Sequence, residues 1–172
     1  KAKKYKILIK RELNKIYKKI YFPNTFFVHR DFHVSNLMLF KNKIGLIDNQ
    51  DSIIGNPTYD LVSLIDDVRI TTSSKLKNKI FNFFLQKTDN IFRNKKTYFV
   101  SDFNILSIQR SLKILGIFYR LFKRDNKKKY LKYMPYTWKL LELRLQGEMF
   151  KELRILLFKA VDKKLRNKKI FK

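Results

Sequence analysis

Cysteine is absent from the 172-residue sequence, and glycine and proline are scarce, with four and three residues. The lack of cysteine excludes a disulfide framework and any cysteine-based metal site. Apolar runs such as Ile114–Tyr119 and Ile155–Phe158 are far shorter than the roughly 20 residues of a membrane-spanning helix, so no membrane span is predicted. No long apolar segment follows the basic N-terminal residues, so no signal peptide is predicted either.

Acidic residues are also few, because 14 Asp and Glu stand against 40 Lys and Arg, for a formal net charge of +26. Hydrophobic residues make up 45% of the chain, including 16 Phe and nine Tyr, which is too many for a charged disordered tail. This charge is typical of a protein that binds nucleic acid or another anionic surface. An AT-rich genome, which favours Lys, Asn, Ile, Phe and Tyr, explains the same composition, and composition alone does not separate the two interpretations.

The charge is unevenly distributed along the chain. The first 20 residues hold nine basic side chains and one acid, and residues 120–172 hold 18 basic and five acidic ones. The stretch from Val28 to Ile70 instead has four basic residues and six Asp. An acidic stretch in so basic a protein indicates that individual carboxylates matter there.

Hydrophobic spacing predicts a mostly helical α+β chain with a small β-element near its start. A helix is expected over the first 20 residues, ended by Pro23-Asn24, followed by short β-prone runs and a polar loop at 29–36. The β-prone runs are Phe26–Val28, Leu37–Phe40 and Ile44–Ile47, the last two joined by Lys41-Asn42-Lys43, and Gly55-Asn56-Pro57 reads as a turn. Further helices are predicted at Tyr59–Ile70, Leu76–Phe92, Asp102–Phe122, Tyr136–Leu145 and Glu148–Leu165. No linker divides the chain, so a single domain over 1–172 is expected, with loops at 28–60 and a helical body at 61–172.

Three polar features follow one another in an order that has a chemical logic. Asp31 comes just after an apolar run, Asn36 lies five residues later, and Asp48 ends the next apolar hairpin. Phosphoryl transfer needs a carboxylate that orients and deprotonates the attacking hydroxyl, and hard oxygen ligands that hold Mg²⁺ on the nucleotide phosphates. We therefore predict Asp31 as the base and Asn36 and Asp48 as the metal ligands.

The same segments resemble a known family. The loop H-R-D-F-H-V-S-N (29–36) is similar to the catalytic loop of the protein-kinase-like fold, in the form used by aminoglycoside phosphotransferases and choline kinases. The segments I-D-N-Q-D (47–51) and G-N-P-T-Y-D-L-V-S-L (55–64) resemble the metal-site aspartate and following helix of that branch. Within this branch the sequence is most similar to bacterial cell-wall amino-sugar kinases. The similarity lies in H-R-D itself, Gln50, the run Ile108–Phe118 and Tyr130–Pro135. Those enzymes phosphorylate the anomeric hydroxyl of N-acetylmuramate and N-acetylglucosamine.

The resemblance implies ATP and Mg²⁺ as cofactors, an amino sugar as acceptor and a cytoplasmic location, with no specific nucleic acid as partner. It implies the same roles for Asp31, Asn36 and Asp48, and an anchoring role for Asp60 at the start of the following helix. The remaining implied site residues are His29, His33 and Gln50 as supports, and Asp51 and Arg110 as acceptor contacts.

Two features depart from the family pattern. Asn49 stands where these kinases usually have an apolar residue, and no glycine precedes Gly45, so no glycine-rich phosphate loop is present. Only 28 residues precede the loop and most of them predict one helix. We therefore expect a kinase-like C-terminal lobe without its nucleotide-binding N-terminal lobe, a fragment that is inactive alone.

Other interpretations stay open at the level of sequence. The chain could be a basic nucleic-acid-binding protein, or a kinase-like scaffold that has lost catalysis. A protein kinase is disfavoured, because Asp48 does not begin a D-F-G motif. Asp66 and Asp67 are expected in ion pairs with nearby Lys or Arg, and Lys127–Lys129 in a solvated loop. The aromatic residues Phe81, Phe83, Phe84, Phe118 and Phe122 are expected in the core.

Overall fold

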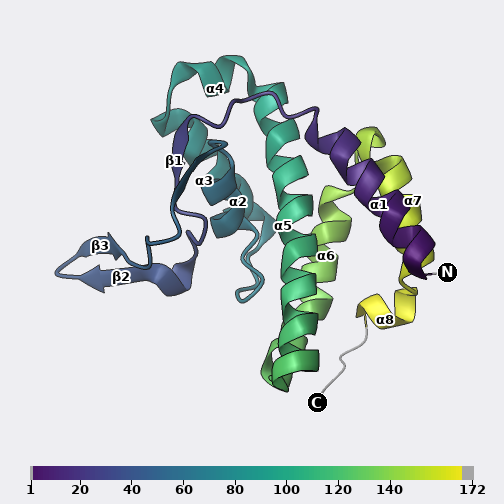
Figure 1. Cartoon of the computed structure of the whole chain (residues 1–172). Helices are drawn as coiled ribbons and strands as arrows, with labels where there is room; N and C mark the ends of the chain where they lie inside the picture. Colours follow the sequence, from purple (N-terminus) through teal and green to yellow (C-terminus); the bar gives the residue numbers. More distant parts are fainter. Residues whose placement is uncertain (1, 168–172) are drawn as a thin grey trace. The chain divides into compact units, whose positions relative to one another are not determined.

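The computed structural model describes residues 2–167 and is mostly helical, as predicted, with two small sheets (Figure 1). By its internal contacts the chain divides into two compact units. One, the mixed unit, comprises residues 20–107 and contains all four strands of the described chain. The other, the helical unit, comprises residues 1–19 and 108–172. Among residues 2–167, no helix combines the length and the apolar character needed to cross a bilayer.

The strands of the mixed unit pair as two separate antiparallel ladders. β2 (Leu37–Phe40) and β3 (Lys43–Leu46) form a hairpin in which Leu37 pairs with Leu46 and Phe40 with Lys43. Lys41 and Asn42 both have positive φ, 44° and 61°, as in the two-residue type I′ turn that matches the twist of a hairpin. The connector is therefore one residue shorter than predicted.

The second ladder was missed in the sequence. β1 (Phe26–Val28) pairs with β4 (Ile53–Gly55), a strand in which only a turn at Gly55 was expected. Gly55 lies opposite Phe26, and a Cβ atom added to it would come within 3.0 Å of the Val28 side chain. The glycine thus allows a close approach of the two strands. Because glycine is common in turns, a turn was predicted here instead of a strand.

The helices of the mixed unit begin or end at other residues than predicted. α2 (Tyr59–Ile65) stops five residues early at a buried Asp66, and α3 (Ser74–Lys87) is separated from α4 (Asn90–Asn94) by Thr88-Asp89. Ser73 is the N-cap of α3, and its hydroxyl accepts the Leu76 N–H at 3.2 Å. α5 (Lys96–Asp125) begins six residues earlier than predicted, and its first residues belong to this unit.

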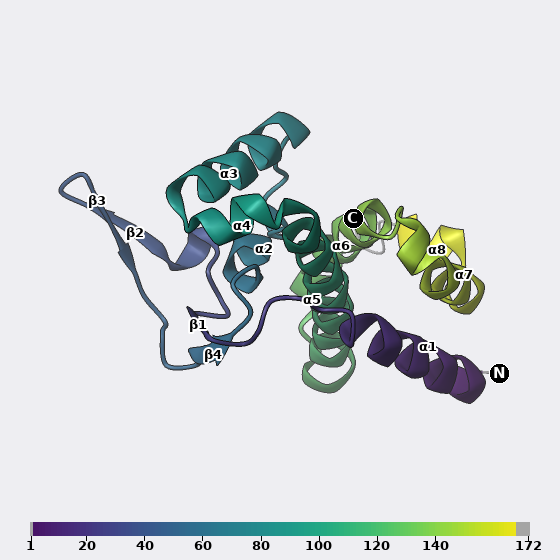
Figure 2. The same cartoon turned by 90° about the horizontal axis from the view of Figure 1, so that it is seen from above.

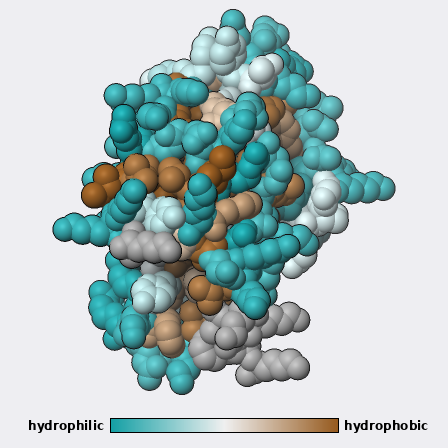
Figure 3. All heavy atoms as spheres, turned by 90° about the vertical axis from the view of Figure 1, so that its right-hand side faces the viewer, coloured by the Kyte–Doolittle hydropathy of each residue, from teal (hydrophilic) through white to brown (hydrophobic). Residues whose placement is uncertain are grey.

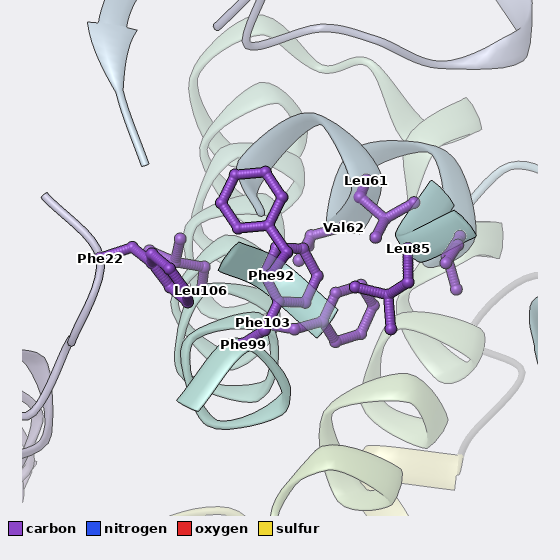
Figure 4. Close-up of a cluster of buried hydrophobic side chains, with 9 residues drawn as sticks. Phe22, Leu61, Val62, Leu85, Phe92, Phe99, Phe103 and Leu106 are labelled. Atoms are coloured by element: carbon purple, nitrogen blue, oxygen red, sulfur yellow. The ribbon is translucent and has the colours of Figure 1, made fainter. Parts of the chain in front are cut away.

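A cluster of buried hydrophobic side chains from α2, α3, α4, α5 and the segment before β1 forms the core of the mixed unit (Figure 4). Phe99 is fully buried, and its ring centroid lies 5.2 Å from that of Phe92 and 5.9 Å from that of Phe22. Burying each such ring contributes roughly 1.5–3 kcal/mol. Phe81 and Phe84 pack against the cluster as predicted, but Phe83 is 58% exposed, so its core assignment was wrong.

A buried carboxylate organises the polar backbone beside this core. Asp102, which has no exposed surface, accepts the N–H groups of Tyr21 and Phe22 at 2.9 Å each and the side-chain amide of Asn56 at 3.0 Å. Asn56 in turn accepts the backbone N–H and the hydroxyl of Thr58 at 2.9 Å each. These bonds satisfy groups whose burial would otherwise be costly, and they fix the segments that lead into β1 and α2.

The helical unit contains α1 (Ala2–Tyr17), the second part of α5, and the elements that follow it. These are η2 (Lys128–Tyr133), α6 (Met134–Arg144), η3 (Glu148–Phe150), α7 (Lys151–Ala160) and α8 (Lys163–Asn167). α1 packs against α7. It ends at Tyr17, six residues before the Pro23 that was expected to end it. The helix predicted over Glu148–Leu165 is interrupted at the extended Val161, after which Asp162 accepts the Lys164 N–H at 2.7 Å.

Candidate active site

The loop that follows β1 is held by a carboxylate in the first turn of α2. Asp60 accepts the backbone N–H of His29 at 2.7 Å and that of Arg30 at 3.0 Å through its two oxygens. Burial raises the pKa of the Asp60 carboxyl above its usual value, and the two backbone hydrogen bonds oppose that rise. Position 60 thus ties the residues just before Asp31 to the start of a buried helix.

Arg30, immediately before Asp31, has a left-handed backbone with φ of 72°. Such a conformation is uncommon for a residue other than glycine and persists only where the surroundings enforce it. Here the Asp60 contact holds the Arg30 amide, while the guanidinium donates to the Asp51 carbonyl at 3.1 Å. Arg30 therefore connects the loop of Asp31 with the turn that follows Asp48.

His29 makes a second connection between the same two segments. Its ring is 1% exposed, and its Nε2–H donates to the Ile47 carbonyl at 3.0 Å. The other ring nitrogen is buried and has no hydrogen-bond partner among the described residues. The ring therefore braces the residue next to Asp48 against the loop of Asp31.

The base of the β2–β3 hairpin brings Asn36 and Asp48 together. Beyond the Leu37–Leu46 pair, the Ile47 N–H donates to the Asn36 carbonyl at 3.1 Å. This register places Asp48 next to Asn36, whose amide nitrogen lies 3.5 Å from an Asp48 carboxylate oxygen. The same nitrogen donates to the Asp31 carbonyl at 3.0 Å. Asp48 also has a left-handed backbone, with φ of 68°, which marks a second enforced conformation in the site.

The Asp31 carboxylate is half-buried and takes part in none of the hydrogen bonds or ion pairs among the described residues. Only its backbone carbonyl is used, by Asn36 and by the His33 N–H at 2.9 Å. The loop is thus fixed through main-chain atoms, which leaves this carboxylate as an acceptor for another molecule.

The other predicted site residues differ in where they lie. Gln50 donates its side-chain amide to Asp48, while Asp51 contributes its carbonyl to Arg30 and has an exposed side chain. His33 is buried beside the same loop. Arg110 belongs to the helical unit, where it is buried.

The donor atoms present suit a divalent cation of the magnesium type. Asp48 offers carboxylate oxygens, and the described contacts of Asn36 use its amide nitrogen and leave the amide oxygen for a cation. Within residues 2–167, no three His, Asp or Glu side chains gather closely enough to hold a metal by themselves. Two protein ligands completed by phosphate oxygens and water are a usual arrangement for Mg²⁺ on a nucleotide.

Sequence reasoning missed Arg30 and Asp102 as organising residues. Arg30 was read as part of a motif without a contact of its own, because nothing local shows a left-handed backbone. Asp102 was assigned to the start of a helix. The apolar residues around it, Phe99, Phe103 and Leu106, were a usable sign that it lies inside α5 and faces the core.

Comparison with known proteins shows which family the sequence around this site resembles. Residues 11–89 match the model of a family described as the phosphotransferase enzyme family. These residues include the whole of the loop and hairpin described above. The family resemblance predicted from the sequence is confirmed.

Individual relatives narrow the comparison. The chain is 30% identical over 135 residues to the N-acetylmuramate/N-acetylglucosamine kinase of Caulobacter vibrioides, covering 76% of this chain and 36% of that protein. It is 37% identical over 112 residues to the kinase of the same name from Neisseria meningitidis, covering 63% and 34%. The corresponding protein of Pseudomonas aeruginosa is 33% identical over 120 residues, covering 67% and 35%. The aligned part of this chain spans about a third of the length of each relative.

Proposed function

We propose that residues 28–60 form the catalytic and metal-binding loops of an ATP- and Mg²⁺-dependent phosphotransferase that acts on a hydroxyl of a small molecule. The observation that carries this proposal is the meeting of three groups at the hairpin base. The Asn36 side chain contacts both the Asp31 backbone and the Asp48 carboxylate, while the Asp31 carboxylate is left unengaged. The acceptor we propose is an amino sugar, because the relatives are named for N-acetylmuramate and N-acetylglucosamine.

In this proposal Asp31 orients the acceptor hydroxyl and takes its proton. The hydroxyl oxygen bonds to the γ-phosphorus of ATP while the bond from that phosphorus to the bridging oxygen breaks and ADP leaves. Asn36 and Asp48 hold the metal ion through their oxygens, and the bound ion would neutralise charge on the nucleotide phosphates. Asp60, Arg30 and His29 keep these groups in position through the contacts described above. We retain Gln50 as a support for Asp48, His33 as a support for the loop, and Asp51 and Arg110 as acceptor contacts.

Transfer by this chain alone is expected to be weak. The site as described offers one candidate base and two metal ligands, and the family also needs groups that hold the nucleotide phosphates. About two thirds of the length of each relative lies outside the part that aligns with this chain. We propose that such additional chain supplies the nucleotide contacts.

A hybrid enzyme tests the proposal directly. The aligned third of the Neisseria meningitidis relative would be replaced by the matching part of this chain, and ATP-dependent phosphorylation of N-acetylmuramate and N-acetylglucosamine measured. Asp31→Asn in the hybrid should lower kcat by about 10²–10⁴-fold, the range for loss of a general base. Asp48→Asn should raise the Mg²⁺ concentration needed for half-maximal rate, because it removes an anionic ligand.

Asp89→Asn is the matched control, since Asp89 is an exposed carboxylate of the same unit whose side chain makes no capping hydrogen bond to α4. It should leave kcat and the Mg²⁺ requirement unchanged. A folded hybrid whose rate survives Asp31→Asn would remove Asp31 from the role of base. A folded hybrid that is inactive with every acceptor would favour the catalytically dead scaffold instead.

A further inference from the structure

The positive charge of the protein is concentrated in one of its two units. The helical unit has 29 Lys and Arg against six Asp and Glu, a net charge of +23. The mixed unit, of almost equal length, has 11 against eight, a net charge of +3. A compositional bias of the genome would give both units a similar excess of Lys and Arg. The segregation therefore points to a role for the charge of the helical unit.

α1 shows how this charge is organised. Its side toward α7 is apolar and is formed by partly or fully buried residues at helical spacing, Tyr5, Leu8, Ile9, Leu13 and Ile16. The opposite side, continued by the first residue after the helix, carries exposed residues, most of them basic: Lys3, Lys4, Lys6, Lys10, Arg11, Lys15 and Lys18, with Ile7, Asn14 and Tyr17 among them. The single acid of the helix, Glu12, is partly buried. We call this outward side, from Lys3 to Lys18, the basic face.

The cations of the basic face are largely uncompensated by carboxylates. A shallow, open depression lies along the face, lined by Lys10, Arg11, Lys15 and Lys18 together with Ile7 and Asn14. Lys15 pairs with Glu12 at 2.9 Å. Among residues 2–167, no carboxylate pairs with Lys10, Arg11 or Lys18. Figure 3, which views the side of Figure 1 where α1 and α7 lie, shows mainly hydrophilic side chains with hydrophobic ones between them.

We propose that the basic face of α1 binds the phosphate backbone of a nucleic acid without sequence preference. A helix of 16 residues is about 24 Å long, and duplex DNA carries about one negative charge per 1.7 Å of its axis. Several Lys and Arg along one side of the helix can therefore meet successive phosphates at once. Each contact releases condensed counterions, which is the main source of affinity in sequence-independent binding.

An anionic membrane is the competing partner for a basic helix. Helices that bind membranes insert their apolar side between the lipids and hold the headgroups with their basic side. In this structure α7 covers the apolar side of α1. The basic face is left to act mainly by charge, which favours the closely spaced phosphates of a nucleic-acid backbone.

The test is fluorescence anisotropy of the full chain with a labelled 20-base-pair duplex of arbitrary sequence, titrated from 50 to 200 mM NaCl. A second duplex of unrelated sequence should bind equally well. The triple variant Lys10→Gln, Arg11→Gln, Lys18→Gln should reduce the slope of log K against log salt by about three, one for each lost phosphate contact. At 50 mM NaCl its affinity should fall at least tenfold.

The matched control removes the same charge from the mixed unit, with Lys75→Gln, Lys79→Gln and Lys96→Gln, all exposed. It should change the slope by less than one. Equal losses in both triple variants would overturn the proposal, as would binding that salt does not weaken. Binding to vesicles of phosphatidylserine and phosphatidylcholine without binding to the duplex would also overturn it. Circular dichroism of both variants checks that they fold. Phosphotransfer by the hybrid enzyme is measured separately and tests only the proposed function, so the two proposals can fail independently.

Discussion

At the scale of single residues, Asp60 is a carboxylate that holds the loop leading to Asp31 in position. Its two oxygens accept two consecutive amides, those of His29 and Arg30. Asparagine has only one side-chain oxygen, so Asp60→Asn would leave at least one of these N–H groups without its acceptor. An unsatisfied backbone donor of this kind costs about 1–3 kcal/mol of stability.

The raised pKa of Asp60 predicts a particular dependence of stability on pH. Burial raises the pKa in the folded state, so the folded protein binds this proton more tightly than the unfolded chain. The resulting stabilisation is fully present below the unfolded pKa and is lost as pH rises through the folded one. We expect the free energy of unfolding of the wild type, minus that of Asp60→Asn, to fall over this window of mildly acidic pH.

Urea unfolding of both proteins across the acidic range measures this difference, and subtracting the variant cancels the other carboxylates. Asp89→Asn, which removes an exposed carboxylate, provides the reference curve. A difference that rises with pH would mean that the backbone hydrogen bonds outweigh burial at position 60.

At the scale of elements, a buried ion pair joins the end of α2 to α3. Lys77 donates to Asp66 at 2.7 Å, with both side chains less than a tenth exposed, and Asp66 also accepts the Ser107 hydroxyl at 2.7 Å. Asp67 lies 3.5 Å from Arg69. The ion pairs predicted for Asp66 and Asp67 are thus confirmed. The partner of Asp66 is the buried Lys77 on the next helix, α3.

Removing one partner of a buried pair leaves an uncompensated charge. Lys77→Ala should therefore destabilise the protein by about 3–5 kcal/mol. Lys79→Ala, two residues away on the same helix and exposed, should change stability by no more than about 0.5 kcal/mol. Chemical denaturation monitored by the single Trp138, or by circular dichroism, compares the two. Equal effects would show that the Asp66 carboxylate finds another partner when Lys77 is lost.

The comparison of these elements with the sequence shows which signals carry structural information. Spacing located α1 and α6, because helical periodicity reflects one buried side. The β-prone residue types located β1, β2 and β3, although the side chains of the β2–β3 hairpin are largely exposed. It failed at β4, where three residues are too few for a pattern, and at the ends of α2 and α5. The end of α2 depends on contacts between distant residues, such as that of Asp66 with Ser107.

The residue types of the candidate site could be read from the sequence more readily than its geometry. The residues Asp31, Asn36 and Asp48 could be selected from their order and chemistry alone. That the Asn36 amide lies within 3.5 Å of Asp48 follows from the hairpin register, which the short turn at Lys41-Asn42 sets. The left-handed conformations at Arg30 and Asp48 have no local signal at all, because neither residue is glycine.

At the scale of the whole molecule, a net charge of +26 opposes the compact state. Like charges lie closer together in a folded unit than in an unfolded chain, and the helical unit alone holds +23 of this charge. Salt screens such repulsion, with a Debye length that falls from about 30 Å at 0.01 M to about 8 Å at 0.15 M. Folding should therefore become more favourable as salt is added.

We expect the Tm, followed by circular dichroism, to rise when NaCl is increased from 10 to 150 mM. Replacing Lys123, Lys128 and Lys159, three exposed lysines of the helical unit, by Gln should raise the Tm at 10 mM and make it less sensitive to salt, because part of the repulsion is already removed. The same number of Gln substitutions at Lys75, Lys79 and Lys96 of the mixed unit should raise the Tm less, since the net charge of that unit is small.

A Tm that is independent of salt, or an equal change of Tm in the two triple variants, would mean that surface ion pairs already balance the charge locally. In that case the segregation of charge between the units would have no consequence for stability.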